Sequence, residues 1–306
     1  MRDQELQRYL MGMGRPFVGE EFWVADPDTK PWDILRRAVG SARLFPTIND
    51  ALPSVTASQY DVVNVAPYYT ELMTTADQID LDKAGLALIG HGRGSAMPKL
   101  DYTDAAGELT IGAADVLVKN IRCRANDPDI LKAVNVEAAG DNFILDGLLL
   151  DVDTTTTDEF LSAIDIAAGA NNGEIIHCRS NMGLGNATQA VHFNGTSIGH
   201  RVAKNYFIGD YSTAVIAGST TLSTLLELFK NTLVNGDGSG LNAQPCIELN
   251  GNSTGIISFN WCVCNLVTMA AAIVAAQCLL FENYYNEDIS GAGTGALIGT
   301  PSANDS

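Results

Sequence analysis

A repeat with a period of 23 to 31 residues runs through two thirds of the chain and limits its fold more than any other feature. Seven eight-residue segments align without gaps: VLVKNIRC (116–123), FILDGLLL (143–150), EIIHCRSN (174–181), RVAKNYFI (201–208), ELFKNTLV (227–234), IISFNWCV (256–263) and LLFENYYN (279–286). A repeat of this length implies that similar units stack on one another, each contacting only its neighbours.

A second series of short apolar runs precedes these segments, from LTIGAAD (109–115) to AIVAAQ (272–277). The runs have strand-like alternation and end in small or turn-forming residues, so each unit reads as strand, tight turn, strand, asparagine-type turn and variable loop. Helical repeats, propeller blades and leucine-rich repeats need other patterns or longer units. The sequence therefore predicts an all-β fold, a single right-handed parallel β-helix whose coils hydrogen-bond at a spacing of about 4.8 Å.

The fifth position of the aligned segments is asparagine in five of the seven units, at Asn120, Asn205, Asn231, Asn260 and Asn283. Asparagine tolerates the left-handed backbone conformation of a sharp corner. Stacked side-chain amides also hydrogen-bond from one coil to the next. We expect a structural asparagine ladder, although asparagine is also simply a common turn residue.

The chain divides into three regions. Residues 1–45 are expected to form an N-terminal arm, residues 46–289 the β-helix, and residues 290–306 an extended tail rich in Gly, Ser and Ala. Within the second region, FPTINDALPSV (45–55) predicts a short helix with Thr47 as its N-cap. This helix would cover the open end of the stack, whose strand edge otherwise recruits other strands.

The residues TINDALPSV, DVVNVAPYYTE, LDKAGLALIGHGRGS and DVLVKNIRC together resemble the N-terminal half of pectin-lyase-like β-helix proteins. The chain from about Phe17 to Asn286 is similar to the short right-handed β-helix proteins of tailed bacteriophages. The resemblance implies a virion structural protein, although a fold alone does not determine a function.

The chain is strongly acidic, with a net charge of −18 and a pI near 4.4. Such a surface repels polyanions, so we expect no nucleic-acid partner. Residues 1–14 lack the apolar run of a signal peptide, and Leu266–Phe281 is too short to span a membrane comfortably. The six cysteines lack the spacing of a disulfide scaffold, which favours assembly in a reducing host cytoplasm.

We expect no catalysis, cofactor or metal. The fourth position of the aligned segments, directly before the asparagine position, holds both acidic and basic residues, which is typical of the solvent-facing side of a sheet. Acidic residues gather near the TTTT loop, where a solvated turn or an incidental cation is expected: Asp151, Asp153, Asp158 and Asp165. The four histidines, His91, His177, His192 and His200, form no metal-binding motif. Four cysteines are expected as small core residues, with a thiol cluster as the alternative: Cys246, Cys262, Cys264 and Cys278.

Two adjacent columns of the repeat are both apolar. One contains Leu117, Ile144, Ile175, Val202, Leu228, Ile257 and Leu280; the next runs from Val118 to Phe281. Neighbouring strand residues point to opposite faces, so both columns cannot face the core unless the backbone bends between them. We take the first column as the candidate oligomer interface, buried in a homotrimer, unless loops between coils cover it.

The near-neutral N-terminal region combines arginine with aromatic residues, which are favoured at interface cores. Its candidate anchor residues are Arg8, Arg15, Phe17, Phe22, Trp23, Trp32, Arg36 and Arg37. They would dock on another virion protein, although the tryptophans have an alternative role in padding the end of the β-helix.

Together these observations favour a non-enzymatic virion protein, specifically a capsid decoration or cement protein that binds the major capsid protein. The alternative is a tail-associated receptor- or glycan-binding protein with an aromatic platform at Tyr206, Trp261, Tyr284 and Tyr285. A polysaccharide lyase or esterase is a third interpretation.

Overall fold

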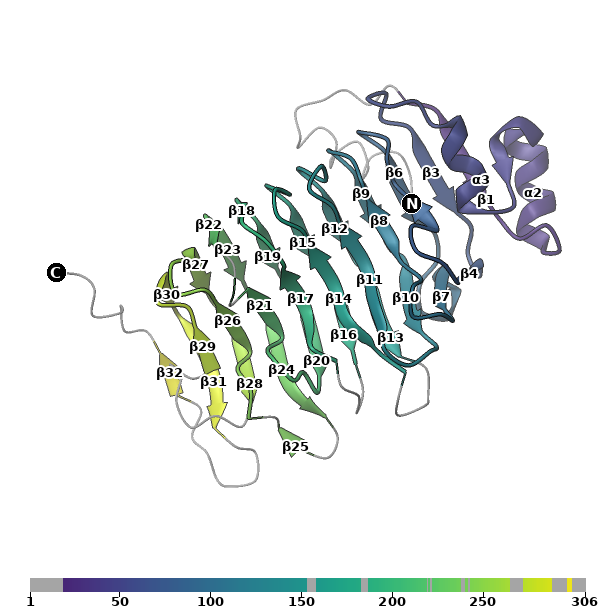
Figure 1. Ribbon diagram of the computed structural model, residues 1–306. Helices are drawn as coiled ribbons and strands as arrows, with labels where there is room; N and C mark the ends of the chain where they lie inside the picture. Colours follow the sequence, from purple (N-terminus) through teal and green to yellow (C-terminus); the bar gives the residue numbers. More distant parts are fainter. Residues whose placement is uncertain are drawn as a thin grey trace.

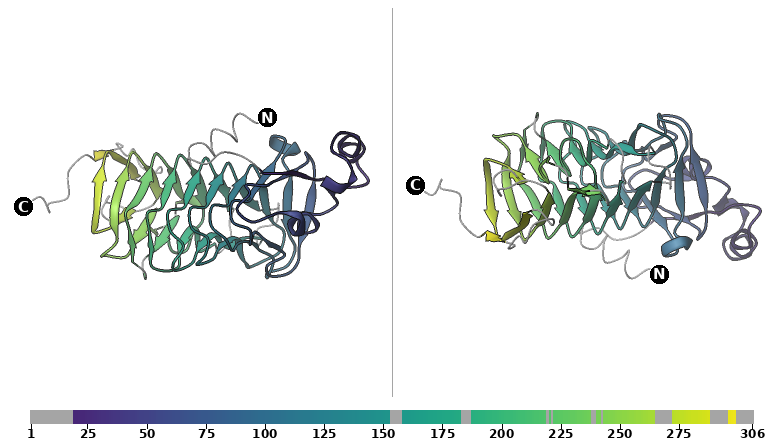
Figure 2. Two further views of the ribbon diagram at one scale, coloured as in Figure 1. Left: turned by 90° about the horizontal axis from the view of Figure 1, so that it is seen from above. Right: turned by 90° about the horizontal axis from the view of Figure 1, so that it is seen from below.

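The computed structural model describes residues 19–152, 158–182, 187–218, 220, 222–237, 240–241, 243–264, 272–287 and 296–298. In these residues the chain winds through three parallel sheets in turn, and most strands pair with the strands one coil before and one coil after (Figure 1). Views from above and below show the coils stacked into an elongated body (Figure 2). The parallel β-helix expected from the sequence is confirmed.

The first sheet, called sheet A, begins beside the N-terminal helices and extends to the last coil. In spatial order its strands are β2 (Leu44–Phe45), β1 (Glu21–Val24), β3 (Val62–Val65), β6 (Ala87–Gly90), β9 (Leu117–Lys119), β12 (Ile144–Asp146), β15 (Glu174–Ile176), β19 (Arg201–Ala203), β23 (Leu226–Phe229), β27 (Thr254–Ser258) and β30 (Gln277–Phe281).

Sheets B and C complete each coil. Sheet B contains the parallel strands β4 (Thr70–Met73), β7 (Lys99–Tyr102), β10 (Arg122–Ala125), β13 (Leu149–Val152), β16 (Arg179–Asn181), β20 (Tyr206–Gly209), β24 (Thr232–Asp237), β28 (Trp261–Cys264) and β31 (Asn283–Glu287), with β25 (Gly240–Leu241) and β32 (Ala296–Ile298) added antiparallel. Sheet C contains β5 (Ile79–Asp80), β8 (Leu109–Ile111), β11 (Ile130–Val136), β14 (Phe160–Ile166), β17 (Gln189–Phe193), β21 (Ile216–Gly218), β26 (Ile247–Leu249) and β29 (Ile273–Val274). Between sheets C and A, β18 (Ser197–Ile198) pairs with β22 (Ser223–Thr224).

Each coil has three long-sheet strands, one more than the repeat indicated. The aligned eight-residue segments bend at their corner, so the residues before it belong to sheet A and those after it to sheet B. From β9–β10 through β27–β28 this corner always has two residues. The connections from sheet B to sheet C vary, with four residues after β10 and nine between β24 and β26.

Inward-facing columns of side chains from all three sheets fill the interior. In sheet A, parallel register aligns an inner column that is at most 1% exposed: Val63, Leu88, Val118, Leu145, Ile175, Val202, Leu228 and Ile257. Sheet C contributes a second buried column, from Leu109 through Ile164 to Ile273. These side chains belong to one continuous core, so no coil buries its own apolar face without its neighbours.

A short helix closes the N-terminal end, as the sequence predicts. Helix α3 (Ile48–Ala51) follows Thr47, whose Oγ1 accepts a hydrogen bond from the Asp50 amide at 3.0 Å. The Ile48 side chain enters the core, and its amide donates to the Glu71 carboxylate at 3.1 Å. Three short 3₁₀ turns, η1 (Ser41–Arg43), η2 (Leu52–Ser54) and η3 (Gly94–Ala96), complete the described helical segments.

The β-helix begins earlier than the boundary at residue 46. Strand β1 pairs in parallel with β3, aligning Phe22 with Val63, so part of the expected arm belongs to sheet A. Helix α2 (Lys30–Val39) packs Trp32, Leu35 and Val39 against a small cluster beside it. Residues 1–18 of the arm, and the expected tail apart from Ala296–Ile298, lie outside the described residues.

The corner between sheets A and B places one residue per coil in the left-handed conformation. These residues have φ between 47° and 69°: Asn120, Gly147, His177, Lys204, Lys230, Phe259 and Glu282. Asn120 therefore occupies the corner itself, whereas the other four asparagines lie one position later. The sequence alignment is therefore wrong by one residue from the third segment onward. Asparagine suits both positions, because it tolerates the left-handed conformation at the corner and its amide can be buried one position later.

Four asparagines form a ladder behind this corner. The Oδ1 of Asn231 accepts from the backbone amide and the Nδ2 of Asn205, both at 3.0 Å, and Asn260 repeats these bonds toward Asn231 at 3.0 and 2.9 Å. Asn283 continues the ladder from Asn260, with both bonds at 3.0 Å, and Asn205 accepts from the Cys178 amide at 2.8 Å. Asn120 instead donates to the carbonyls of Gly90 and Gly92.

A second ladder lies between sheets C and A and was not predicted from the sequence. Asp115, Asn142 and Asn172 also have positive φ, and the Asn142 amide group donates to Asp115 at 3.2 Å. The backbone amide of Asn171 donates to Asp141 at 2.7 Å. Asp and Asn are mixed at these positions, so no column of a single residue type revealed the ladder.

The asparagine ladder leads to the first prediction. Asn260→Leu removes the acceptor of two Asn231 donors and leaves the Leu228 carbonyl without its 2.8 Å bond. Buried groups that lose partners cost about 1–3 kcal/mol each, so we expect a loss of about 2–4 kcal/mol, measured by urea unfolding. In the same assay Asn252→Ala, in an exposed turn, should cost less than about 0.5 kcal/mol. Equal losses in the two variants would contradict a stabilising role for the ladder.

Candidate functional site

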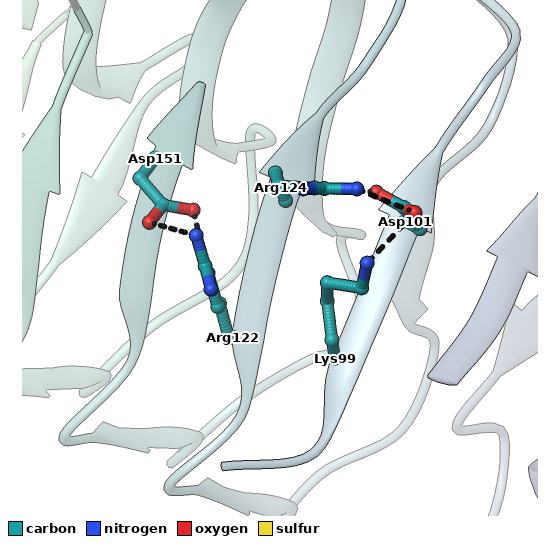
Figure 3. Close-up of polar contacts among 5 residues, drawn as sticks. All are labelled: Lys99, Asp101, Arg122, Arg124 and Asp151. Atoms are coloured by element: carbon teal, nitrogen blue, oxygen red, sulfur yellow. Dashed lines mark hydrogen bonds and ion pairs between the residues drawn. The ribbon is translucent and has the colours of Figure 1, made fainter. Parts of the chain in front are cut away.

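The outer face of sheet B carries a network of paired charges from successive coils (Figure 3). The Asp101 carboxylate binds Lys99 Nζ at 2.9 Å and the Arg124 guanidinium at 2.8 and 2.9 Å. Arg122 makes two bonds to Asp151, at 3.0 and 2.8 Å. All four carboxylate oxygens therefore contact a cationic group.

Sheets A and C repeat this arrangement over three successive coils each. On sheet A, Asp146 lies between Lys119 at 2.7 Å and His177 at 2.9 Å. On sheet C, Asp165 lies between Lys132 at 3.1 Å and His192 at 2.7 Å. Each buried carboxylate is thus paired from the coils before and after it, which avoids like charges on neighbouring strands.

The pKa values of Asp101 and Asp151 move in opposite directions. Burial alone would raise the pKa of Asp101, but bonds to Arg124 and Lys99 lower it below its usual range. Burial raises the pKa of Asp151 despite its contacts with Arg122. Such divergence is a feature of acid–base pairs in hydrolases. Here, however, the two side chains are only 8% and 16% exposed, and their oxygens already bind arginine, so the geometry favours structural pairing.

The acidic residues near the TTTT loop do not converge. Asp151 pairs on sheet B and Asp165 on sheet C, while Asp158 forms a backbone bridge with Pro128. Asp153 lies outside the described residues. Across the part of the chain that the structure describes, no group of three or more His, Cys, Asp or Glu is arranged to hold a metal ion.

The four histidines occupy separate places, and only His200 lies in the core. Its Nδ1 accepts from the Gly173 amide at 3.0 Å, so Nε2 carries the proton and donates to the Ala170 carbonyl at 3.0 Å. Burial between Phe143 and Phe193 lowers the pKa of His200 to about 4. His91 stacks on Trp23 at 5.0 Å.

All six cysteines are buried and free of disulfides. Cys246 is within hydrogen-bonding reach of Cys262 and Cys264, whereas Cys278 Sγ donates to the Ser253 carbonyl at 3.4 Å. Burial raises the pKa of Cys123 to about 12, with the same effect on Cys178. A thiolate is the reactive form of cysteine, so these thiols behave as core residues.

The candidate oligomer interface needs correction. Ile175, Val202, Leu228 and Ile257 belong to the inner column of sheet A, and Leu280 packs against the core. Only Leu117 and Ile144 point outward. The cause is again the one-residue slip at the corner, because in a strand a shift of one position exchanges the two faces.

Sheet A has two outward columns. Leu117 and Ile144 align with Glu174, Arg201 and Glu227, whereas Ile176, Ala203 and Phe229 lie in the neighbouring column with Lys119 and Asp146. In the last coils both columns end in exposed apolar side chains: Ile256 and Leu279 in the first column and Phe281 in the second are 48%, 63% and 54% exposed. An exposed apolar surface on ordered strands is characteristic of a binding site.

Aromatic rings extend this exposed surface around the corner into sheet B. Phe259 contacts Phe229 and Phe281 edge-to-face, with centroids 5.6 and 5.7 Å apart. Trp261 and Tyr284 stack at 6.1 Å and an interplanar angle of 27°. We call the residues Ile256, Phe259, Trp261, Leu279, Phe281 and Tyr284 the C-terminal patch. Of the expected platform, Tyr206 is exposed two strands earlier, whereas Tyr285 packs against the core.

The candidate anchor residues differ in their burial. Phe22 is buried in the core, and Trp23 and Trp32 pack in the cluster beside α2, as their padding role implies. Arg36 contacts Asp33 at 3.6 Å, and Arg37 and Ile34 of α2 are exposed. Arg8, Arg15 and Phe17 lie outside the described residues.

The buried histidine generates the second prediction. The unfolded chain binds a proton on His200 near pH 6.5 but the folded chain only near pH 4. Stability is therefore full above pH 6.5 and falls as the pH drops to 4, by about 3 kcal/mol. His200→Gln should remove this loss in urea titrations at pH 7, 5.5 and 4. Phe160→Leu, a core change elsewhere, should lower stability at every pH yet keep the slope; an unchanged slope in His200→Gln would contradict the assignment.

Comparison of the chain with protein-family models, with curated proteins and with solved structures finds no match. In the described part of the chain, no helix has both the length and the apolar character needed to cross a membrane.

Proposed function

We propose that this chain is a non-enzymatic structural protein of a bacteriophage virion, acting as a capsid decoration protein that binds the major capsid protein. The C-terminal patch carries this proposal, because it joins exposed apolar and aromatic side chains on paired strands. The charged outer faces support a structural role, because their buried carboxylates are engaged by cationic or imidazole partners. The resemblance to phage β-helix proteins supplies the virion context.

The C-terminal patch is also the proposed self-association surface. Its members Ile256, Leu279 and Phe281 lie at the C-terminal ends of the two outward columns of sheet A. Three copies placed side by side would bury it around a symmetry axis. Helix α2, at the opposite end of the body, then remains free to contact the capsid through Ile34 and Arg37 (Figure 1).

The third prediction tests self-association. Light scattering after size exclusion should give a trimer for the natural chain at micromolar concentration. Phe281→Asp places a charge in the patch and should yield monomers, because a buried unpaired charge is costly. Leu72→Asp changes a side chain of similar exposure, 56%, on the outer face of sheet B and should leave the trimer intact. A monomeric natural chain would refute the proposed interface.

A glycan-binding function is the second candidate. The Trp261–Tyr284 stack offers two exposed rings on neighbouring strands, and carbohydrate rings pack on such aromatic faces. This observation favours a tail-associated receptor-binding protein over an enzyme.

The fourth prediction separates the two functions. Quantitative mass spectrometry of purified particles should find the chain on the order of hundreds of copies, as multivalent decoration requires. A handful of copies would contradict decoration and indicate a tail protein. In that case Trp261→Ala should abolish binding on a glycan array, while Tyr68→Ala, an exposed tyrosine near the N-terminal end, should not.

A further inference from the structure

The second half of the chain has few cations, and all of them lie near one edge of the body. Only four Lys or Arg residues follow Lys132, against 17 Asp and Glu. Arg179 begins β16 and Arg201 begins β19, while Lys204 and Lys230 occupy the A–B corner in successive coils. This corner therefore carries a local positive charge in an otherwise acidic half of the chain.

Three of these four cations are available to an external anion. Arg201 lies between Glu174 and Glu227, at 3.9 and 3.1 Å, and is compensated by them. The others are exposed and form no ion pair with the residues that the structure describes: Arg179, Lys204 and Lys230. Their N–H donors can therefore form charge-assisted hydrogen bonds with a bound carboxylate.

The outer face of sheet B beside this corner lacks carboxylates. Parallel register from β16 through β28 aligns two outward columns, one with Arg179, Tyr206, Thr232 and Trp261, the other with Asn181, Ile208, Val234 and Val263. In earlier coils the second column instead contains Asp101 and Asp151. An anion that approaches the later coils thus meets no like charge from these columns.

Two exposed aromatic rings flank the cations. Tyr206 is 45% exposed, and Trp261, two coils later in the same column, is 55% exposed. Thr232 lies between them, so their backbone positions are about 9.6 Å apart at about 4.8 Å per coil, above a smaller side chain. Carbohydrate rings pack on such aromatic faces, and the threonine hydroxyl can hydrogen-bond to a sugar.

We call this surface the corner strip; it shares Trp261 with the C-terminal patch and consists of Arg179, Lys204, Tyr206, Lys230, Thr232 and Trp261. The asparagine ladder fixes its backbone. Asn205 and Asn231 directly follow the two lysines, are at most 2% exposed, and bond to each other at 3.0 Å. The strip is therefore preorganised, which lowers the cost of ordering it around a ligand.

An acidic sugar chain suits the corner strip better than an acidic peptide does. Peptides that bind a sheet commonly add a strand to an open edge, but β16, β20 and β24 are paired on both sides. Sugar rings need only side chains, through stacking and hydrogen bonds. We infer that the corner strip binds an acidic glycan, with Arg179, Lys204 and Lys230 on its carboxylates and the aromatic rings against its sugars. This inference rests on the glycan-binding candidate above and specifies the class of glycan.

The fifth prediction uses the full chain and an array of uronic-acid and sialic-acid oligosaccharides, each matched by the same sugar with its carboxylates reduced to alcohols. The acidic sugars should bind about tenfold more tightly than the reduced ones, and Lys204→Gln with Lys230→Gln should remove this difference. Lys204→Arg with Lys230→Arg should keep it. Lys83→Gln with Arg93→Gln removes the same charge from the first coils and should also keep it. Matching urea unfolding curves would show that all variants are folded.

The possible failures are distinguishable. Equal binding of acidic and reduced sugars would overturn the inference but leave a glycan-binding function. Binding of neither would contradict both. Equal losses in the two glutamine double variants would overturn the inference, because affinity would then follow net charge alone. Polyglutamate bound as tightly as the acidic sugars would overturn it in favour of an acidic protein partner.

Discussion

Every coil of this protein depends on its neighbours for both backbone hydrogen bonds and buried side-chain contacts. Parallel register carries Val118, Leu145 and Ile175 into one inner column, and the same register stacks the asparagine amides behind the corner. A single coil has neither a closed core nor paired strands. Stability is thus a property of adjacent pairs, and it accumulates along the stack.

The corner between sheets A and B keeps this register. Lys204, Lys230, Phe259 and Glu282 adopt the left-handed conformation there, which costs about 1 kcal/mol or more for residues with a Cβ atom. The asparagine that follows each of them offsets this cost by donating its side-chain amide to a backbone carbonyl of the preceding coil. In earlier coils Asn120 and Gly147 tolerate the conformation themselves, and no ladder is needed.

Much of the fold was predictable because the period, the strand patterning and the Thr47 cap are local properties of the sequence. Which apolar column faces inward was not predictable to the same degree. It depends on whether the corner falls at Cys178 or at His177, a difference of one residue that reverses the faces of the strand. The Arg124 partner of Asp101 and the Lys132 partner of Asp165 were also hidden, because parallel pairing across coils, and not sequence proximity, brings these cations to the carboxylates. Trp261 and Tyr284 were identified because both lie just after the corner.

Two of the three connections in each coil, from sheet A to sheet B and from sheet B to sheet C, differ in what they allow evolution to change. The A–B corner keeps two residues from β9–β10 through β27–β28, whereas the B–C connections range from four to nine residues. One residue added at the A–B corner would exchange the inward and outward faces of the strand that follows. Residues added to a B–C connection only lengthen a surface loop. New recognition loops can therefore arise along one edge of the body without disturbing the strand pairing between coils.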